Sequence, residues 1–111
     1  MSGPDIKKLF AVPLSNAPGK TVTTFLLDYA PGEKSPPHRH GTAIVVAYVL
    51  SGKLRSQVEG EPVQIYKAGE HLFEPLGAHH FVCENASKDQ NLKLLCTLIH
   101  DSSDQNIVDY D

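Results

Sequence analysis

The stretch that decides the fold is PGEKSPPHRHGTAIVVAYVLSG, residues 31–52. It places two histidines, His38 and His40, two positions apart, after a pair of prolines and before a strongly apolar run. Side chains two positions apart on an extended chain point to the same side, so both imidazoles are expected to face one way. The stretch therefore predicts a strand end that directs two nitrogen donors into one space.

Outward from this stretch, short runs of β-branched and aromatic residues alternate with turns rich in Gly, Pro, Asn and Asp. No segment keeps apolar residues at helical spacing over three turns. The predicted strands span residues 8–14, 21–29, 43–50, 53–58, 62–67, 71–75, 79–85 and 92–99. Many short strands at close spacing predict an all-β sandwich or barrel, and the length fits one domain over residues 1–111.

Composition excludes several classes of function. The chain of 111 residues has a formal net charge of −3, which provides no basic surface for nucleic acid. No apolar stretch approaches the roughly 18 residues that span a bilayer, and the opening MSGPDIKK lacks the apolar part of a signal peptide. We therefore expect a cytoplasmic protein with no nucleic-acid or membrane partner. Cys83 and Cys96 form no metal-binding motif, although a disulfide between them stays open.

A third histidine follows in the segment HHFVCEN, residues 79–85. Because side chains alternate along a strand, one of His79 and His80 must point inward and the other outward. An inward ring that meets His38 and His40 would bring three nitrogen donors together. Imidazole suits Fe, Zn, Cu and Ni, and three protein ligands leave coordination positions open for water or substrate.

The pattern around these histidines resembles the cupin family. The first cupin motif is similar to residues 32–52, with Gly32, five residues, His38 and His40 in HRH, and Gly52 at the expected spacings. The second motif is similar to residues 69–85, with Gly69, five residues, PLG at 75–77 and His80. Its asparagine, Asn85, stands one place late. The resemblance implies a double-stranded β-helix, or jelly-roll, in a single cupin domain.

The resemblance also implies a metal site at His38, His40 and His80. The glutamate that cupins usually add four residues after the histidine pair is replaced by Val45, and no carboxylate stands between Gly41 and Leu50. The expected site is therefore made of three histidines, or it is not a metal site. It is similar to the sites of three-histidine cupin dioxygenases, which implies iron first, with Zn, Ni, Cu or Mn as alternatives.

Further residues were assigned by strand parity. Glu74 is a candidate to hold a ligand imidazole from behind, although it would equally suit the solvent face of its strand. Tyr48 is a weaker candidate to donate its phenol to a substrate, because tyrosine more often packs in the core or at a rim. By alternation His79 should point away from the site if His80 points in, and His71 is expected at the surface.

Two functions are expected from this pattern. One is a small metal-dependent enzyme, dioxygenase-like or an isomerase or lyase, acting on a small organic molecule inside the barrel. The other is a non-catalytic cupin that binds or senses a small molecule, with a structural or lost metal. A homodimer is expected through the apolar segment 8–14, because strand edges need cover. The acidic tail, residues 100–111, is either frayed or packed on the barrel through Ile107, Val108 and Tyr110.

Overall fold

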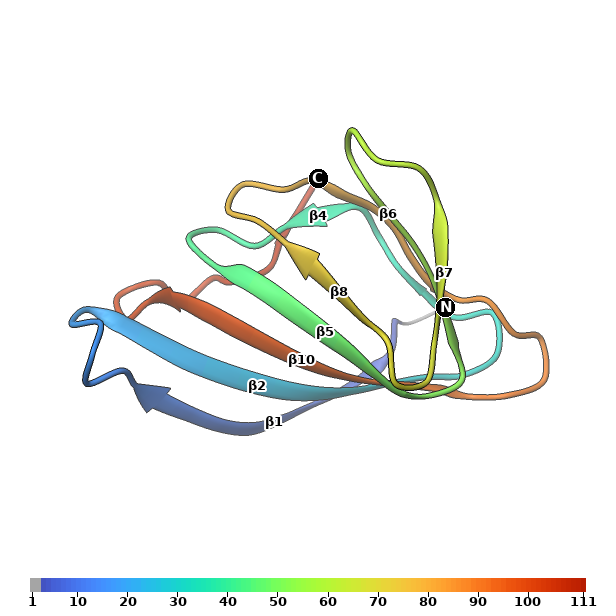
Figure 1. Cartoon of the computed structure of the whole chain (residues 1–111), viewed down its shortest axis with the longest axis horizontal. Coiled ribbons are helices and arrows are strands. Elements are labelled where there is room, and N and C mark those ends of the chain that lie inside the picture. The colour runs from blue at the N-terminus through green and yellow to red at the C-terminus, as the bar shows by residue number, and fades with distance from the viewer. Residues whose placement is uncertain (1–2) are drawn as a thin grey trace.

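In the computed structural model, which describes residues 3–111, every regular element is a strand (Figure 1). The predicted all-β fold is confirmed, and so is its double-stranded β-helix form. The strands are β1 (Asp5–Pro13), β2 (Lys20–Tyr29), β3 (Lys34–Ser35), β4 (His38–Arg39), β5 (Ile44–Ser51), β6 (Lys53–Val58), β7 (Gln64–Lys67), β8 (His71–Glu74), β9 (His80–Asn85), β10 (Leu92–Asp101) and β11 (Asp109–Tyr110).

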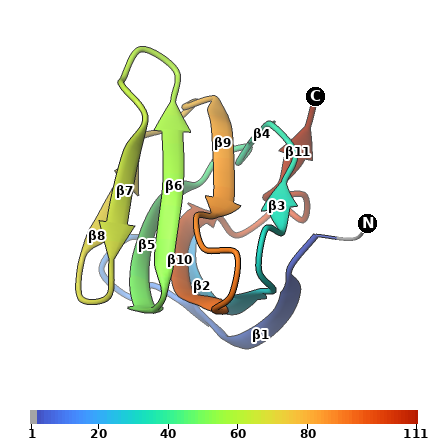
Figure 2. The same cartoon turned by 90° about the vertical axis from the view of Figure 1, so that its right-hand side faces the viewer.

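These strands form two sheets that face each other (Figures 1 and 2). The first runs in the order β1-β2-β10-β5-β8, and the second in the order β11-β4-β9-β6-β7, with β3 paired to β9. All pairings are antiparallel. Strands distant in sequence are neighbours, as where β10 lies between β2 and β5, so the chain closes into a jelly-roll.

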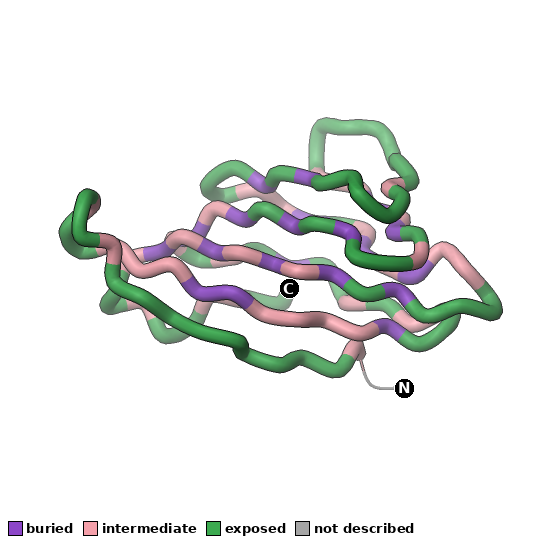
Figure 3. The backbone as a smooth tube through the Cα atoms, turned by 60° about the horizontal axis from the view of Figure 1, so that its bottom comes forward, coloured by how far each residue is buried: buried purple, intermediate pink, exposed green. Residues whose placement is uncertain are grey.

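Buried residues alternate with less buried ones along the central strands, as the colouring of the backbone in Figure 3 shows. In β10, Leu92, Leu94, Cys96 and Leu98 are buried, and the residues between them are less so. Tyr29, Val49 and Leu54 join the same core from β2, β5 and β6. The period of two that separates the faces of a strand is therefore what fills the barrel.

The eight predicted strands all form, with ends shifted by up to a few residues, and three short strands were missed. β3, β4 and β11 have two residues each, too short for an alternating pattern to appear. The expectation of a frayed tail is wrong. Residues 100 and 101 complete β10, Ile107 packs against the core, and β11 pairs with β4.

The outer face of the first sheet carries exposed apolar side chains. A row of paired residues crosses all five strands: Phe10, Thr24, Thr97, Val46 and Phe73. Phe10, Val46 and Phe73 are each exposed, as are all residues of the edge strand β1. Among residues 3–111, no helix is long and apolar enough to cross a membrane.

Gly52 lies between β5 and β6, where the backbone of residues 91 and 92 approaches it closely. This close approach can be tested by substitution. The φ of Gly52, 84°, is left-handed, and a Cβ there would overlap the backbone carbonyl oxygen of Asn91. Gly60 has a similar φ of 89° but has no neighbour within 4 Å of a Cβ. Both substitutions to Ala should cost about 1–2 kcal/mol of backbone strain, and Gly52→Ala should cost about 1–3 kcal/mol more from the overlap. Urea unfolding of both variants measures the difference, and equal losses would contradict the close packing at Gly52.

Candidate metal centre

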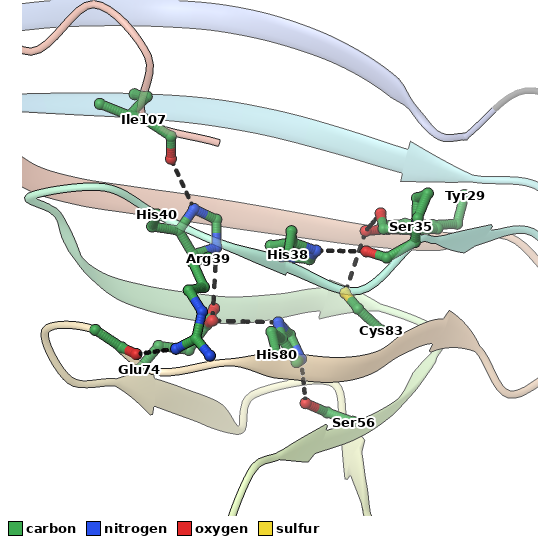
Figure 4. A network of polar contacts seen from close by, with 12 residues as sticks. Tyr29, Ser35, His38, Arg39, His40, Ser56, Glu74, His80, Cys83 and Ile107 are labelled. Carbon is green, nitrogen blue, oxygen red and sulfur yellow. Dashed lines mark hydrogen bonds and ion pairs between the residues drawn. The ribbon is translucent and has the colours of Figure 1, made fainter. Parts of the chain in front are cut away.

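Three histidines come together because two short segments of the second sheet pair. His38 of β4 lies directly opposite His80 of β9, and His40 follows just beyond the end of β4. The ring centroids of His38 and His40 are 4.8 Å apart, and those of His38 and His80 are 5.1 Å apart. His38 and His80 are buried. The structure thus brings the three predicted ligands into one cluster, in which Figure 4 shows their rings around a common space.

Glu74 joins this cluster from the opposite sheet. It ends β8, is only 3 % exposed, and lies opposite Val45 in the antiparallel pairing of β5 with β8. Its Oε1 is 3.2 Å from Nδ1 of His80 and 3.5 Å from Nε2 of His40. The solvent-facing alternative for Glu74 is therefore wrong. The inward alternative, in which Glu74 contacts an imidazole of the cluster, is the one that the structure shows, and position 45 itself contributes no carboxylate.

The cluster has the donor set and the spacing of a transition-metal site. One ligand atom from each of His38, His40, Glu74 and His80 lies within 4.8 Å of all the others. Oε1 of Glu74 and Nδ1 of His80 are both buried with no hydrogen-bond partner among the described residues, although they face each other. An unpaired buried polar atom costs free energy. A cation between these two atoms would satisfy both, so these residues fit a metal ion.

Each imidazole has a hydrogen-bond partner, which is a backbone carbonyl for His38 and His40 and a hydroxyl for His80. Nδ1 of His38 donates to the carbonyl oxygen of Pro36 at 2.6 Å, and Nδ1 of His40 donates to the carbonyl oxygen of Ile107 at 2.9 Å. Nε2 of His80 lies 2.7 Å from Oγ of Ser56. Because a carbonyl can only accept, the protons of His38 and His40 are fixed on Nδ1, which leaves each Nε2 lone pair free. These partners orient the rings and set their tautomers.

The protonation states also suit metal binding. Burial lowers the pKa of His38 below its ordinary value, with His40 and His80 adding to the effect. Burial acts to raise the pKa of Glu74, but contact with His80 and the neighbouring His40 and His38 outweigh it, so its pKa lies below the ordinary value. A neutral imidazole and an ionised carboxylate are the forms that coordinate a metal.

The cluster lies in the wall of a cavity of about 270 Å³ between the two sheets. Apolar side chains from both sheets form most of the lining, among them Phe25, Leu54 and Leu98. The C-terminal segment contributes Val108 and Tyr110, and Tyr110 lies 6.0 Å from His38 between ring centroids. The cluster therefore faces a partly open, mainly apolar cavity whose size suits a small molecule.

Two of the other residues assigned from sequence lie as expected, and one does not. His79 points away from the cluster toward Asp111, with Nε2 at 2.8 Å from Oδ2, and His71 is exposed. Tyr48 is not in the site, which corrects its assignment. It is 42 % exposed on the outer face of β5, because it has the opposite parity to the buried Val45 and Ala47.

The interior also holds two thiols that remain protonated. Burial raises the pKa of Cys83 to about 12, with Tyr29 and Glu74 among its neighbours, and burial raises the pKa of Cys96 as well. Both cysteines are free. Because the thiolate is the reactive form, the raised pKa makes both residues poor nucleophiles at neutral pH.

Sequence reasoning missed the partners of the imidazoles. Ser56 and Ile107 are 24 and 67 residues away from the histidines they contact, and the Ile107 contact is made by a backbone carbonyl. The pattern of side chains in a sequence does not indicate which backbone carbonyl will contact a distant histidine. The inward direction of Glu74, in contrast, had a signal: it has the same parity as the buried Leu72 in a strand with one apolar face.

Comparison with known proteins agrees with the fold. Residues 25–98, about two thirds of the chain, match the model of the cupin domain, and the chain belongs to the cupin family. A 69-residue stretch is 36 % identical to germin-like protein subfamily 2 member 2 of Arabidopsis thaliana. That match covers 59 % of this chain and only 32 % of the relative, so the chain spans about a third of the length of that protein.

Solved structures share the fold at low sequence identity. Oxalate oxidase in complex with glycolate superposes with a TM-score of 0.74 at 21 % identity, over 97 % of this chain and 55 % of the other. KdgF from Halomonas sp. gives a TM-score of 0.70 at 20 % identity, over 92 % of this chain and 82 % of that one. These structures establish the double-stranded β-helix fold. At this sequence identity they do not indicate the chemistry of this chain, which has to be argued from its own residues.

The contact between Ser56 and His80 generates a prediction. Ser56→Ala leaves Nε2 of the buried His80 without a partner, which should lower the free energy of unfolding of the metal-free protein by about 1–3 kcal/mol. Ser102, an exposed serine that contacts Thr21, is the control, and Ser102→Ala should change stability by less than about 0.5 kcal/mol. Chemical denaturation followed by circular dichroism measures both, and an unchanged Ser56→Ala variant would show that Ser56 does not hold the ring.

Proposed function

We propose that this cupin binds one divalent transition metal through His38, His40, Glu74 and His80 and uses it on a small organic molecule in the barrel. The observation that carries the proposal is the pair of buried, unpartnered atoms, Oε1 of Glu74 and Nδ1 of His80, that face each other within the cluster. Iron is the first candidate, followed by zinc, nickel, copper or manganese, because imidazole and carboxylate accept all of them.

The reaction class we propose is metal-dependent, either dioxygenase-like or an isomerase or lyase. A bound metal supplies Lewis-acid or redox chemistry to a substrate oxygen. The protein side chains hold and orient: Pro36, Ile107 and Ser56 fix the imidazoles, and the apolar walls exclude water. Apart from the proposed ligands, the titratable side chains of the cavity are tyrosines and cysteines, and burial raises the pKa of Tyr29 and both thiols. The metal is therefore the expected source of reactivity.

The lack of a separate acid–base pair supports a second candidate. The described residues that line the cavity include no free carboxylate or histidine beyond the proposed ligands. A site of this kind also suits a binding or sensing domain in which the metal captures a small molecule without turnover. Substrate depletion by the metal-loaded protein, measured against a metal-free control, separates the two.

A cytoplasmic location is part of the proposal. Cys83 and Cys96 are both free and buried, and disulfides form mainly in oxidising compartments. Free cysteines inside the barrel are consistent with a reducing environment.

We also propose a homodimer. The strand β1 pairs with β2 on one edge only, and its residues are exposed throughout. Ile6, Leu9, Phe10 and Val12 place apolar surface on this strand, and it continues into the exposed row that includes Val46 and Phe73. An open strand edge beside an apolar sheet face suits a second copy of the chain, because strand pairing and apolar burial then act together.

Metal analysis tests the proposed centre. The wild-type protein should bind about one metal ion per chain, and His38→Ala, His40→Ala and His80→Ala should each lose most of it, because each change removes one of four donors. Glu74→Gln should weaken binding, since the carboxylate charge is lost. His79→Ala is the matched control and should retain the metal, because His79 faces Asp111. Elemental analysis after loading measures the content, and a wild-type protein that takes up no metal would refute the centre.

A reciprocal exchange identifies where the carboxylate comes from. Val45→Glu alone should place two carboxylates opposite each other and destabilise the metal-free protein, because like charges across a strand pair repel. Combining Val45→Glu with Glu74→Val should return metal binding toward the wild-type level. Failure of the combined variant to bind metal, with its β fold intact by circular dichroism, would show that position 45 cannot replace position 74.

Light scattering after size exclusion tests the dimer. The wild-type protein should elute at about twice the chain mass of 12.1 kDa. Phe10→Asp should shift the population toward monomer, because it puts a charge into the apolar row. Ile65→Asp is the control, since Ile65 is similarly exposed but lies on β7 of the other sheet. A wild-type monomer at micromolar concentration would contradict the dimer.

A further inference from the structure

The charges around the cavity restrict what it can bind. No lysine or arginine among the described residues lines it, and its only carboxylate is Glu74. Three neutral histidines, one carboxylate and a divalent ion sum to a charge of about +1 at the metal. A ligand with one negative charge would neutralise the centre. A second negative charge would enter an apolar space without a partner, which is unfavourable.

Three polar groups in the interior of the cavity wall are already engaged with one another. The Tyr29 hydroxyl lies 2.9 Å from Oγ of Ser35 and 3.3 Å from Sγ of Cys83, both within hydrogen-bond distance. These groups satisfy each other, so they offer little to a ligand that carries several hydroxyl or carboxyl groups. The remaining lining is mainly aliphatic and aromatic, with Phe25, Leu27, Leu94 and Leu98 among its members. The wall therefore suits an apolar body.

The size of the cavity sets the scale of that body. Its volume of about 270 Å³ is near the lower end of the range of about 300–1,000 Å³ that ligand sites occupy. A two-carbon acid would leave most of this space unfilled. A chelating head with a ring or a branched chain attached would fill it and bury apolar surface, which favours binding in proportion to the area removed from water.

We propose that the cavity selects small monoanionic chelators with an apolar body and discriminates against small dicarboxylates. The proposal rests on the metal centre proposed above and specifies the substrate class of that centre. It separates this chain from a structural neighbour named as an oxalate oxidase, with which it shares only the fold. The metal binds the charged head, and the apolar walls provide the preference for the body.

Isothermal titration of the nickel-loaded protein tests the selection with three probes. Benzohydroxamate and acetohydroxamate share one monoanionic head and differ in their apolar body, and oxalate carries two charges and no apolar body. Titration of the same probes into the nickel complex of bis(2-pyridylmethyl)glycinate, which has three nitrogen donors, one carboxylate and a charge of +1, gives their intrinsic affinity for such a metal. After this correction, benzohydroxamate should bind at least about tenfold more tightly than acetohydroxamate, and oxalate should bind most weakly.

A variant at the cavity edge supplies the charge control. Ile6 lines the cavity and is exposed on β1 in the single chain, so Ile6→Arg adds a cation at the cavity edge, and light scattering must show the same oligomeric state as the wild type. This change should shift the ratio of affinities by roughly tenfold toward oxalate. Val63→Arg adds the same charge at an exposed position that does not line the cavity, and it should leave the ratio unchanged.

The possible outcomes distinguish failure of the proposed substrate class from failure of the proposed metal centre. Nickel uptake with a corrected preference for oxalate, or with no preference between the hydroxamates, would overturn the substrate class and leave the metal centre intact. Absence of nickel uptake would overturn the metal centre. In that case NMR titration of the metal-free protein with benzamide and with oxalate still tests the cavity: shifts of the Leu94 and Leu98 methyl signals with benzamide alone support the apolar body, and shifts with oxalate alone refute it.

Discussion

Antiparallel pairing between β5 and β8 places Val45 directly opposite Glu74, and the chemistry of the barrel interior depends on that register. Residues opposite each other on paired strands point to the same face. A carboxylate that leaves one strand can therefore be replaced from its neighbour with little change in where the charge lies. A shift of one residue would turn Glu74 to the solvent and bring Phe73 inward, so the pairing that closes the sheet also fixes the composition of the metal cluster.

The sequence predicted the strands and the histidines well, because both depend on local alternation. The runs around residues 21–29 and 92–99 have one apolar side, and His38, His40 and His80 stand in two motifs whose spacing is visible in the chain. The direction of Glu74 was left open, although its parity with the buried Leu72 in the same strand indicated the interior. Its closeness to His40 and His80 depends on how β8 packs against the other sheet, which its own segment does not show. The contact from Ile107 was invisible for a related reason: a backbone carbonyl 67 residues away carries no side-chain signature.

The cluster also shows how a nearly apolar interior tolerates charge. Glu74 is buried with its pKa below the ordinary value, and its neighbours are imidazoles whose other nitrogens each have a hydrogen-bond partner. The arrangement leaves two buried atoms facing each other without a hydrogen bond. Such a defect is costly in a folded protein and is retained most readily where a ligand removes it. The same reasoning explains why the surrounding wall is free of other unpaired polar groups.

The position of Glu74 in its sheet has a consequence for how the barrel comes apart. In the order β1-β2-β10-β5-β8, the strand β5 is interior and β8 is at the edge. With the carboxylate at position 74 instead of position 45, an ion held by the proposed site would be anchored on an edge strand and not on an interior strand. It would connect that edge to β4 and β9 of the other sheet. Release of the ion would allow β8 to fray and expose the edge of β5, so starvation for metal would become a route to aggregation.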